Sequence, residues 1–325
     1  MITVLNKILK KITLFKHFEA KTRGRILCVS LHPRCRRKSI YVLKSFEIYT
    51  RVLTSSTMAV DMRCDKLEQT VVSVSDVYSI KSSLLKFADD TKILRKIYSA
   101  EDNRQLQEDI DTLLEWSRNW QMTFNADKCK VMHTGSRNQP CMQYYMEGQK
   151  LEKCHEEKDL GVLVSDDLKV ESQCNQAFSK ANRMLGILKR NIVNKTPRIM
   201  VNLYKTLIRP HVEYCVSAWS PYYVKDKNTL ERIQHRFTKL IPGLQRLTYA
   251  ERLEKLGLWT LEERRNRADL IEVFKMANNL SPIPLSNYFE INTDGRTRGH
   301  SLKLVKHRCN TEIRRHFFSE RVINR

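Results

Sequence analysis

Residues 84–93, LLKFADDTKI, decide how the rest of this chain is interpreted. A short apolar run ends in two adjacent carboxylates, Asp89 and Asp90, and an extended, alternating pattern resumes after them. An apolar run, a polar turn and a second extended run are typical of a hairpin. The stretch therefore predicts a strand, an acidic turn and a second strand.

Asp89 and Asp90 at the tip of that hairpin would repel each other unless a cation lies beside them, so the turn is a candidate divalent-metal ligand. Nucleotidyl transfer uses such carboxylates, because two Mg²⁺ ions activate the attacking hydroxyl and stabilise the leaving pyrophosphate. Acidic residues are also common in solvated turns, and turn statistics alone favour that ordinary interpretation. The hairpin by itself leaves both interpretations open.

The segment that follows the hairpin, up to residue 168, mixes a helix with short strands. Apolar residues recur at helical spacing over about 102–120, and Glu147-Gly148-Gln149 is a hairpin signal. Further strand candidates are 122–124, 130–133, 144–146, 150–151 and 160–164. We expect these short strands to form a small antiparallel sheet.

Residues 169–280 are predicted to be helical throughout. The strongest periodicity runs from Val170 to Ile192, and a helix begun by Thr196-Pro197 should be kinked by Pro210. A third helix covers about 230–240. Two capping boxes begin two more helices: Thr248 with Glu251, and Thr260 with Glu263.

The two ends of the chain are patterned less clearly. Residues 1–80 carry basic clusters without a sustained period, apart from a strand candidate at 71–80, and are interpreted as a basic extension. Residues 1–25 are basic with few acids, which weakly resembles an organelle-targeting segment, although a solvated basic helix fits better. Residues 281–325 are predicted to form an irregular basic arm with one short helix near Glu312.

The charge of the chain favours nucleic acid as a partner. Its 325 residues include 58 Lys and Arg against 36 Asp and Glu, a net charge of +22. Such a chain tends to bind phosphate backbones, because each contact releases counterions. The alternatives are a merely basic protein, or a decayed coding sequence. The candidate phosphate-contacting residues on the first two long helices are Lys180, Arg183, Lys189, Arg190, Lys195, Arg198, Lys205 and Arg209, followed by Arg232, Arg236 and Lys239 on the third.

Other classes of protein find little support. Nine cysteines at irregular spacing in a chain of this length argue against a disulfide scaffold and favour a reducing intracellular compartment, nuclear or cytoplasmic. No apolar run is long enough to span a membrane. Cys129 and His133, with Cys154-His155 downstream, are poorly spaced for a structural zinc site. The four tryptophans, Trp116, Trp120, Trp219 and Trp259, are predicted to be buried rather than to stack on bases.

The blocks that surround and follow Phe87-Ala88-Asp89-Asp90 resemble the reverse transcriptases of non-LTR, jockey-like retrotransposons. The aromatic-Ala-Asp-Asp hairpin, the helix and strand over 106–125, and Asp127-Lys128-Cys129-Lys130 are similar to consecutive blocks of that family. Asp159-Leu160-Gly161-Val162 and the segments at 204–214 and 230–234 continue the resemblance in the same order. It runs over about residues 82–325 and does not include residues 1–80.

The resemblance implies an α+β fold, with an incomplete polymerase palm of short antiparallel strands over 81–168 and an all-helical thumb over 169–280. It implies that Asp89 and Asp90 are the catalytic, Mg²⁺-binding carboxylates of an RNA-directed DNA polymerase. Lys128 would lie near the phosphates of the incoming dNTP. The helices would hold a primer–template duplex of RNA and DNA.

Two parts of the family's active site do not appear in this sequence. The family places another catalytic Asp on a strand well upstream of the hairpin, and a Pro-Gln-Gly-Ser block before it. No Pro-Gln-Gly string occurs here, and Asp61, Asp65 and Asp76 lie in other contexts. We therefore expect a truncated reverse transcriptase without polymerase activity of its own. The alternatives are a non-enzymatic nucleic-acid-binding helical module and a decayed element without a selected function.

Overall fold

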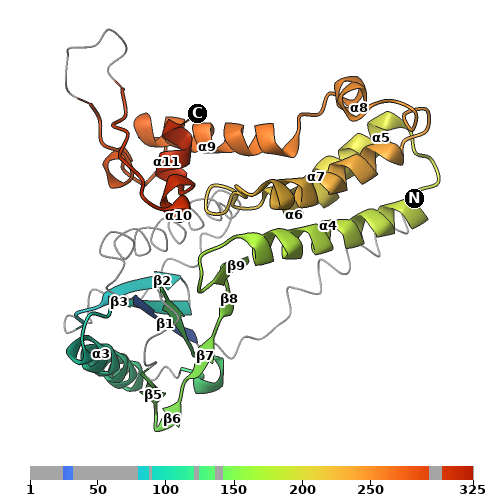
Figure 1. The fold of residues 1–325 in the computed structure, drawn as a ribbon. Helices are drawn as coiled ribbons and strands as arrows, with labels where there is room; N and C mark the ends of the chain where they lie inside the picture. The colour runs from blue at the N-terminus through green and yellow to red at the C-terminus, as the bar shows by residue number, and fades with distance from the viewer. Residues whose placement is uncertain are drawn as a thin grey trace.

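The computed structural model of this chain describes residues 25–31, 80–87, 90–120, 124–135, 142–292 and 302–324. Figure 1 shows a small sheet with one helix against it, and a set of longer helices that continues from the sheet towards the C-terminus. The predicted basic helix at the N-terminus, the strand candidate at 71–80 apart from Ile80, and the tip of the hairpin, Ala88-Asp89, lie outside the described residues. In the part of the chain that is described, no helix is both long and apolar enough to cross a membrane.

The sheet has five strands and is mostly parallel. Its strands are β1 (Arg25–Leu31), β2 (Ser83–Phe87), β3 (Asp90–Lys96), β4 (Lys130–Thr134) and β7 (Glu152–Cys154), in the order β2-β3-β1-β4-β7. The predicted hairpin is confirmed, because β2 and β3 pair antiparallel. The prediction of a small antiparallel sheet is wrong for these five strands, because all their other neighbouring pairs, β3 with β1, β1 with β4 and β4 with β7, run parallel. A helix connects β3 to β4, and such a crossover returns the chain in its original direction.

Strand β1 is the largest departure from the sequence prediction. Arg25–Leu31, RILCVSL, comes from the region interpreted as an extension, yet it lies in the sheet between β3 and β4. A parallel strand in the middle of a sheet tends to be a short, continuous apolar run without alternation. Such a run gives no period by which it could be recognised.

Helix α3 (Ala100–Asn119) is confirmed and packs against the sheet. Ser99 and Asp102 form a capping box at its start, and Leu106, Ile110 and Leu113 are fully buried on one side. Asp109 on the same helix is also buried, and its carboxylate accepts the backbone N–H groups of residues 81 and 82. A buried carboxylate of α3 therefore fixes the entry into β2.

Two further hairpins follow β4, one between β4 and β7 and the other between β7 and the long helices. The predicted one pairs β5 (Tyr145–Met146) with β6 (Gln149–Lys150), and the positive φ angles of Glu147 and Gly148 fit a two-residue turn of the type that hairpins favour. The other pairs β8 (Glu156–Asp159), which was not predicted, with β9 (Val162–Ser165). Strand β9 leads directly into the first long helix.

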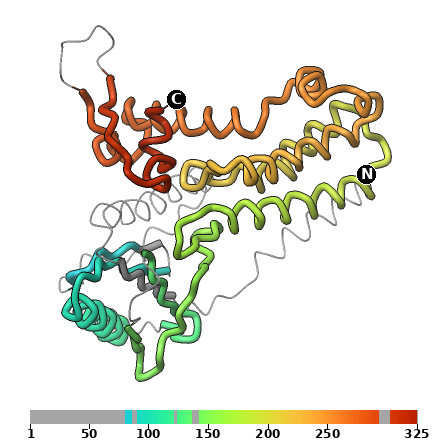
Figure 2. Tube along the Cα trace, viewed as in Figure 1, coloured from blue at the N-terminus to red at the C-terminus, as the bar shows by residue number. Residues whose placement is uncertain are grey.

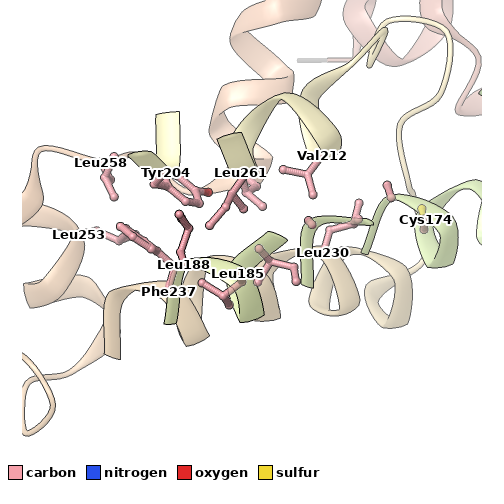
Figure 3. Close-up of a cluster of buried hydrophobic side chains, with 14 of the residues drawn as sticks. Cys174, Leu185, Leu188, Tyr204, Val212, Leu230, Phe237, Leu253, Leu258 and Leu261 are labelled. Carbon is pink, nitrogen blue, oxygen red and sulfur yellow. The ribbon is translucent and has the colours of Figure 1, made fainter. Parts of the chain in front are cut away.

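The long helices pack around one apolar core, part of which Figure 3 shows. The main elements are α4 (Glu171–Asn191), α5 (Pro197–Leu203), α6 (Arg209–Glu213) and α7 (Val224–Lys239). Between α5 and α6 lies a π-helical segment, η5 (Tyr204–Ile208), where the N–H of Arg209 bonds back to the carbonyl of Tyr204. Pro210 lacks a backbone N–H and disrupts the regular helical bonding there. The kink that the sequence predicted at Pro210 therefore takes the form of a π-helical turn, which is wider than a regular α-helical turn.

Both predicted capping boxes are confirmed, at α8 (Tyr249–Leu256) and α9 (Leu261–Ala277). At α9, the Thr260 hydroxyl accepts the N–H of Glu263, and the Glu263 carboxylate accepts the N–H of Thr260. We expect Thr260→Ala to lower the free energy of unfolding by about 1 kcal/mol, because one N–H at the helix start loses its partner. Urea denaturation measures this change, and Thr260→Ser, which keeps the hydroxyl, should lose much less.

The C-terminal region is more ordered than predicted. Besides η6 (Leu285–Asn287) and the expected short helix α10 (Glu312–Arg315), it contains α11 (Phe318–Ile323). Phe318 and Val322 are buried beside α9, and Arg321 binds the buried Asp269 of α9 through two hydrogen bonds of 2.9 Å. The prediction of an irregular arm is wrong here, because one turn of apolar residues is too short to show a helical period.

Candidate nucleic-acid interface and the Asp-Asp hairpin

The hairpin places Asp90 at one edge of the sheet. In register, Asp90 lies opposite Phe87 of β2 and beside Arg25 of β1. Asp89, the other carboxylate of the predicted metal site, lies outside the described residues. Asp90, which the sequence predicted as a metal ligand, is therefore the first residue of β3 and lies at the end of that strand.

The strand beside the hairpin supplies no carboxylate. Strand β1 runs parallel to β3 in the place next to Asp90, and its sequence RILCVSL contains no acidic residue. Across the described ranges, no three His, Cys, Asp or Glu side chains lie close enough to hold a metal ion. The described residues next to Asp90 thus do not fit a site for two Mg²⁺ ions.

Lys128, the residue predicted near nucleotide phosphates, lies at the same edge of the sheet. It ends the short 3-10 helix η4 (Ala126–Lys128), is exposed, and lies two residues before the start of β4 at Lys130. In the parallel register, Asp90 is level with Arg25 of β1, and Lys130, the first residue of β4, is level with Leu27, two residues further along β1. The sheet therefore brings this lysine and the hairpin to one edge.

A buried ion pair that the sequence did not reveal lies behind the hairpin. The ammonium of Lys92 on β3 is 2.6 Å from the carboxylate of Asp159 on β8, and the side chains are 5% and 4% exposed. Thr91, Ile93 and Leu94 are buried as well, so β3 is enclosed on both faces. The pair joins two of the sequence blocks, the hairpin and Asp159-Leu160-Gly161-Val162.

The strongest positive feature is a stretch of 41 residues, 172–212, that contains no Asp or Glu; it covers α4 after its first residue, Glu171, together with α5, η5 and most of α6. All eight cations predicted for the first two helices lie in it. Arg183, Lys189, Arg190, Arg198 and Lys205 are exposed, whereas Lys180, Lys195 and Arg209 are partly buried.

Seven of these eight cations have no carboxylate partner among the described residues; the exception is Arg209, whose guanidinium lies 3.5 Å from Glu213. On α4, Arg183 and Arg190 are two turns apart, on the side opposite the buried stripe that includes Cys174, Ala181 and Leu188. Burial lowers the pKa of Lys180, and the nearby Lys158 adds to the effect. The five exposed cations of this stretch are therefore accessible to an anion from solution.

Two of the three basic residues predicted on α7 lie against α4. The guanidinium groups of Arg232 and Arg236 are 5.7 and 5.6 Å from the ring centre of Phe178, and Arg236 donates to Asn182 at 2.9 Å. Arg232, Arg236 and Lys239 also line an open hollow of about 420 Å³. Two further cations, Arg232 and Arg236, are therefore positioned by packing along α4.

The prediction for the tryptophans is half correct. Trp116 and Trp219 are buried. Trp120 and Trp259 are 49% and 50% exposed, so the expectation that they belong to the core is wrong. Trp120 ends α3, and Trp259 lies in the turn before α9 with Arg267 over its ring at 5.0 Å. Both lie at helix ends, where the apolar stripe no longer determines which side chains are covered.

Comparison with known proteins gives relatives for about half of the chain. It is 26% identical over 163 residues to the RNA-directed DNA polymerase from mobile element jockey of Drosophila melanogaster, and 26% identical over 168 residues to that of Drosophila funebris. Each match covers 48% of this chain and 18% of the relative, so the chain spans about a fifth of their length. No family model and no solved structure matches it. The resemblance to a jockey-like reverse transcriptase is thereby confirmed for about half of the chain.

Proposed function

We propose that this chain is a nucleic-acid-binding segment of reverse-transcriptase origin, which holds an RNA- or DNA-containing duplex along α4 and α5 and does not extend primers by itself. The observation that carries the proposal is the acid-free stretch 172–212, with its exposed, unpaired cations. The similarity to the RNA-directed DNA polymerases of jockey elements supports nucleic acid as the partner. An incomplete palm followed by a helical thumb is part of the same proposal.

The spacing of the cations suits a phosphate backbone. Arg183 and Arg190 are seven residues apart on α4, and Arg198 and Lys205 are seven apart on α5 and η5. Seven helical residues rise by about 10 Å, so each pair can reach phosphates of one strand without crossing a groove. Contacts of this kind position a duplex and carry no base information. We therefore propose binding that depends strongly on salt and weakly on sequence.

The absence of polymerase activity is proposed from the sheet. Two-metal catalysis needs carboxylates from more than one strand, and β1, the parallel neighbour of β3, carries Arg25 beside Asp90 and no acid. No Pro-Gln-Gly string occurs in the chain to shape a dNTP site. We therefore assign no catalytic step to Asp89 or Asp90, and none to Mg²⁺.

Binding is tested with the whole chain and a 20-base-pair duplex of DNA or RNA–DNA hybrid in a salt series from 50 to 400 mM. If about five to seven cations meet phosphates, the logarithm of the binding constant should fall linearly with the logarithm of salt, with a slope of about −4 to −6. Two unrelated sequences should give the same curve. Undetectable binding, or a slope near zero, would contradict the proposal.

Polymerase activity is tested separately, with Mg²⁺, a primer–template and dNTPs. We expect no primer extension above a protein-free control, because the electrostatic stabilisation of the transition state is incomplete. Asp89→Asn, prepared in parallel, distinguishes a contaminant from the chain itself. Extension by the unaltered chain that disappears in Asp89→Asn would show that this part of the proposal is wrong.

A further inference from the structure

A cavity of about 670 Å³ lies where the start of α7, the helix α9 and the C-terminal segment meet. Volumes of about 300–1,000 Å³ are usual for small-molecule sites. Glu262 is the one carboxylate among its described lining residues. The cations that line it are Lys227, Arg265, Lys306, Arg308, Arg315 and Arg321.

Arg265 is the most unusual of these cations. It is 3% exposed, and its Nε has no hydrogen-bond partner. One of its Nη atoms donates to the carbonyl of Val212 at 3.4 Å, and no carboxylate in the described part of the chain forms an ion pair with it. A buried charge is normally paired, because leaving water without a counter-ion is costly. Arg321, in the same wall, shows the usual arrangement, with Asp269 as its partner.

The rim adds charge that is also uncompensated. Lys306 and Arg308 are exposed, and neither has an ion-pair partner within the described residues. By contrast, Lys227 is paired with Glu262 at 2.6 Å, and Arg315 with Glu312 at 2.6 Å. Three of the lining cations, one buried and two exposed, therefore form no ion pair with a carboxylate of the described residues, and Glu231 and Glu213 act on Arg265 only from a distance. Guanidinium groups match the oxygens of phosphate with parallel hydrogen bonds.

We propose that this cavity is a binding site for a phosphate-bearing anion, with Arg265 at its floor and Lys306 and Arg308 at its rim. The ligand is either a free polyphosphate or the phosphates of a nucleic acid, which share this chemistry.

The site is separate from the cations at the far end of α4. Lys225, near the start of α7, is paired with Glu171 at the start of α4, so the cavity lies near that end of the helix. Lys189 and Arg190 are at the other end of the 21-residue helix, about 30 Å away along its axis. The inference therefore goes beyond the duplex contact along α4 and α5.

The test is thermal unfolding of the whole chain with inorganic tripolyphosphate, against sodium sulfate at equal ionic strength. At a hundredfold excess over Kd, we expect the Tm to rise by about 4 °C in tripolyphosphate, from the linkage between binding and stability. Arg265→Met should remove this rise. Arg267→Gln removes the same charge from an exposed position on the same helix, and it should keep the rise in Tm.

The double variant Lys306→Gln/Arg308→Gln, whose positions are exposed, reports on the cavity even if Arg265→Met does not fold. It should reduce the rise to less than half. The proposal would be overturned if tripolyphosphate raised the Tm of this double variant as much as that of the unaltered chain. It would also be overturned if sulfate raised the Tm of the unaltered chain as much as tripolyphosphate. If a 20-base-pair duplex displaces tripolyphosphate from the cavity, the phosphates belong to nucleic acid; if it does not, the ligand is a free polyphosphate.

The same measurements separate this inference from the proposed function. Arg183→Gln/Arg190→Gln alters the α4 surface and leaves the cavity intact, so it should keep the full rise in Tm. A chain that fails to bind duplex but is stabilised by tripolyphosphate, in a manner that needs Arg265, would contradict the proposed function and support this site.

Discussion

Replacing Asp159 with Asn should lower the free energy of unfolding by about 3–5 kcal/mol, because it removes the carboxylate charge that lies 2.6 Å from the buried ammonium of Lys92. The two groups are 2.6 Å apart, and both side chains are almost fully enclosed. Asn keeps the shape of Asp and removes only the charge, so the loss reports the electrostatic pairing. Urea denaturation followed by circular dichroism measures it.

Two controls make the interpretation specific. Lys92→Met combined with Asp159→Leu removes both charges, and it should recover most of the lost stability, since apolar pairs of similar volume often replace buried ion pairs without loss. Glu171→Gln breaks the exposed pair with Lys225 and should change stability by less than about 1 kcal/mol. A change below 1 kcal/mol for Asp159→Asn would contradict the structural role assigned to the pair.

The pair also has a consequence for the architecture. Lys92 lies in the hairpin strand β3, whereas Asp159 ends β8, and β9 then leads into α4. Breaking the pair should therefore loosen the connection between the sheet and the long helices. Protease cleavage near 156–165 in Asp159→Asn, at concentrations that leave the unaltered chain intact, would show this directly.

The sequence predicted elements whose signals are local. The hairpin of β2 and β3, helix α4 and the capping boxes at Thr248 and Thr260 each depend on residues close together in the chain, and all are present. Strand β1 depends on pairing with β3, more than fifty residues later, so its short apolar run carried no distinguishing pattern. The parallel arrangement of the sheet could not be predicted without that strand.

The residues of the candidate sites likewise include some that the sequence could reveal and others that depend on contacts between distant parts of the chain. The cations of 172–212 could be identified from the sequence because their helical spacing separates them from the buried stripe. The ion pair of Lys92 with Asp159 spans 67 residues, so no local pattern in the sequence relates the two side chains to each other. The burial of Arg265 without an ion pair could not be predicted either, since it depends on residues distant in sequence, such as Val212, whose carbonyl accepts its hydrogen bond.

The largest effect on binding should come from removing four cations at once: Arg183→Gln, Arg190→Gln, Arg198→Gln and Lys205→Gln. Each is exposed and has no ion pair within the described residues, so their loss should not weaken the fold. Each phosphate contact contributes about 0.9 to the salt slope for B-form DNA. The slope should therefore decrease by about 3–4, and the affinity at 0.1 M salt should fall roughly 10³-fold.

A matched variant decides whether this face or merely the net charge is responsible. Lys150→Gln, Lys153→Gln, Arg246→Gln and Lys255→Gln remove the same charge from exposed positions outside α4 and α5. Because exposed charges more than a Debye length apart, about 10 Å at 0.1 M salt, are largely screened, this variant should lose less than tenfold in affinity. Equal losses in both variants would mean that the duplex responds to overall charge and that α4 and α5 form no specific interface. An unequal loss with unchanged Tm would place the phosphates along these two helices.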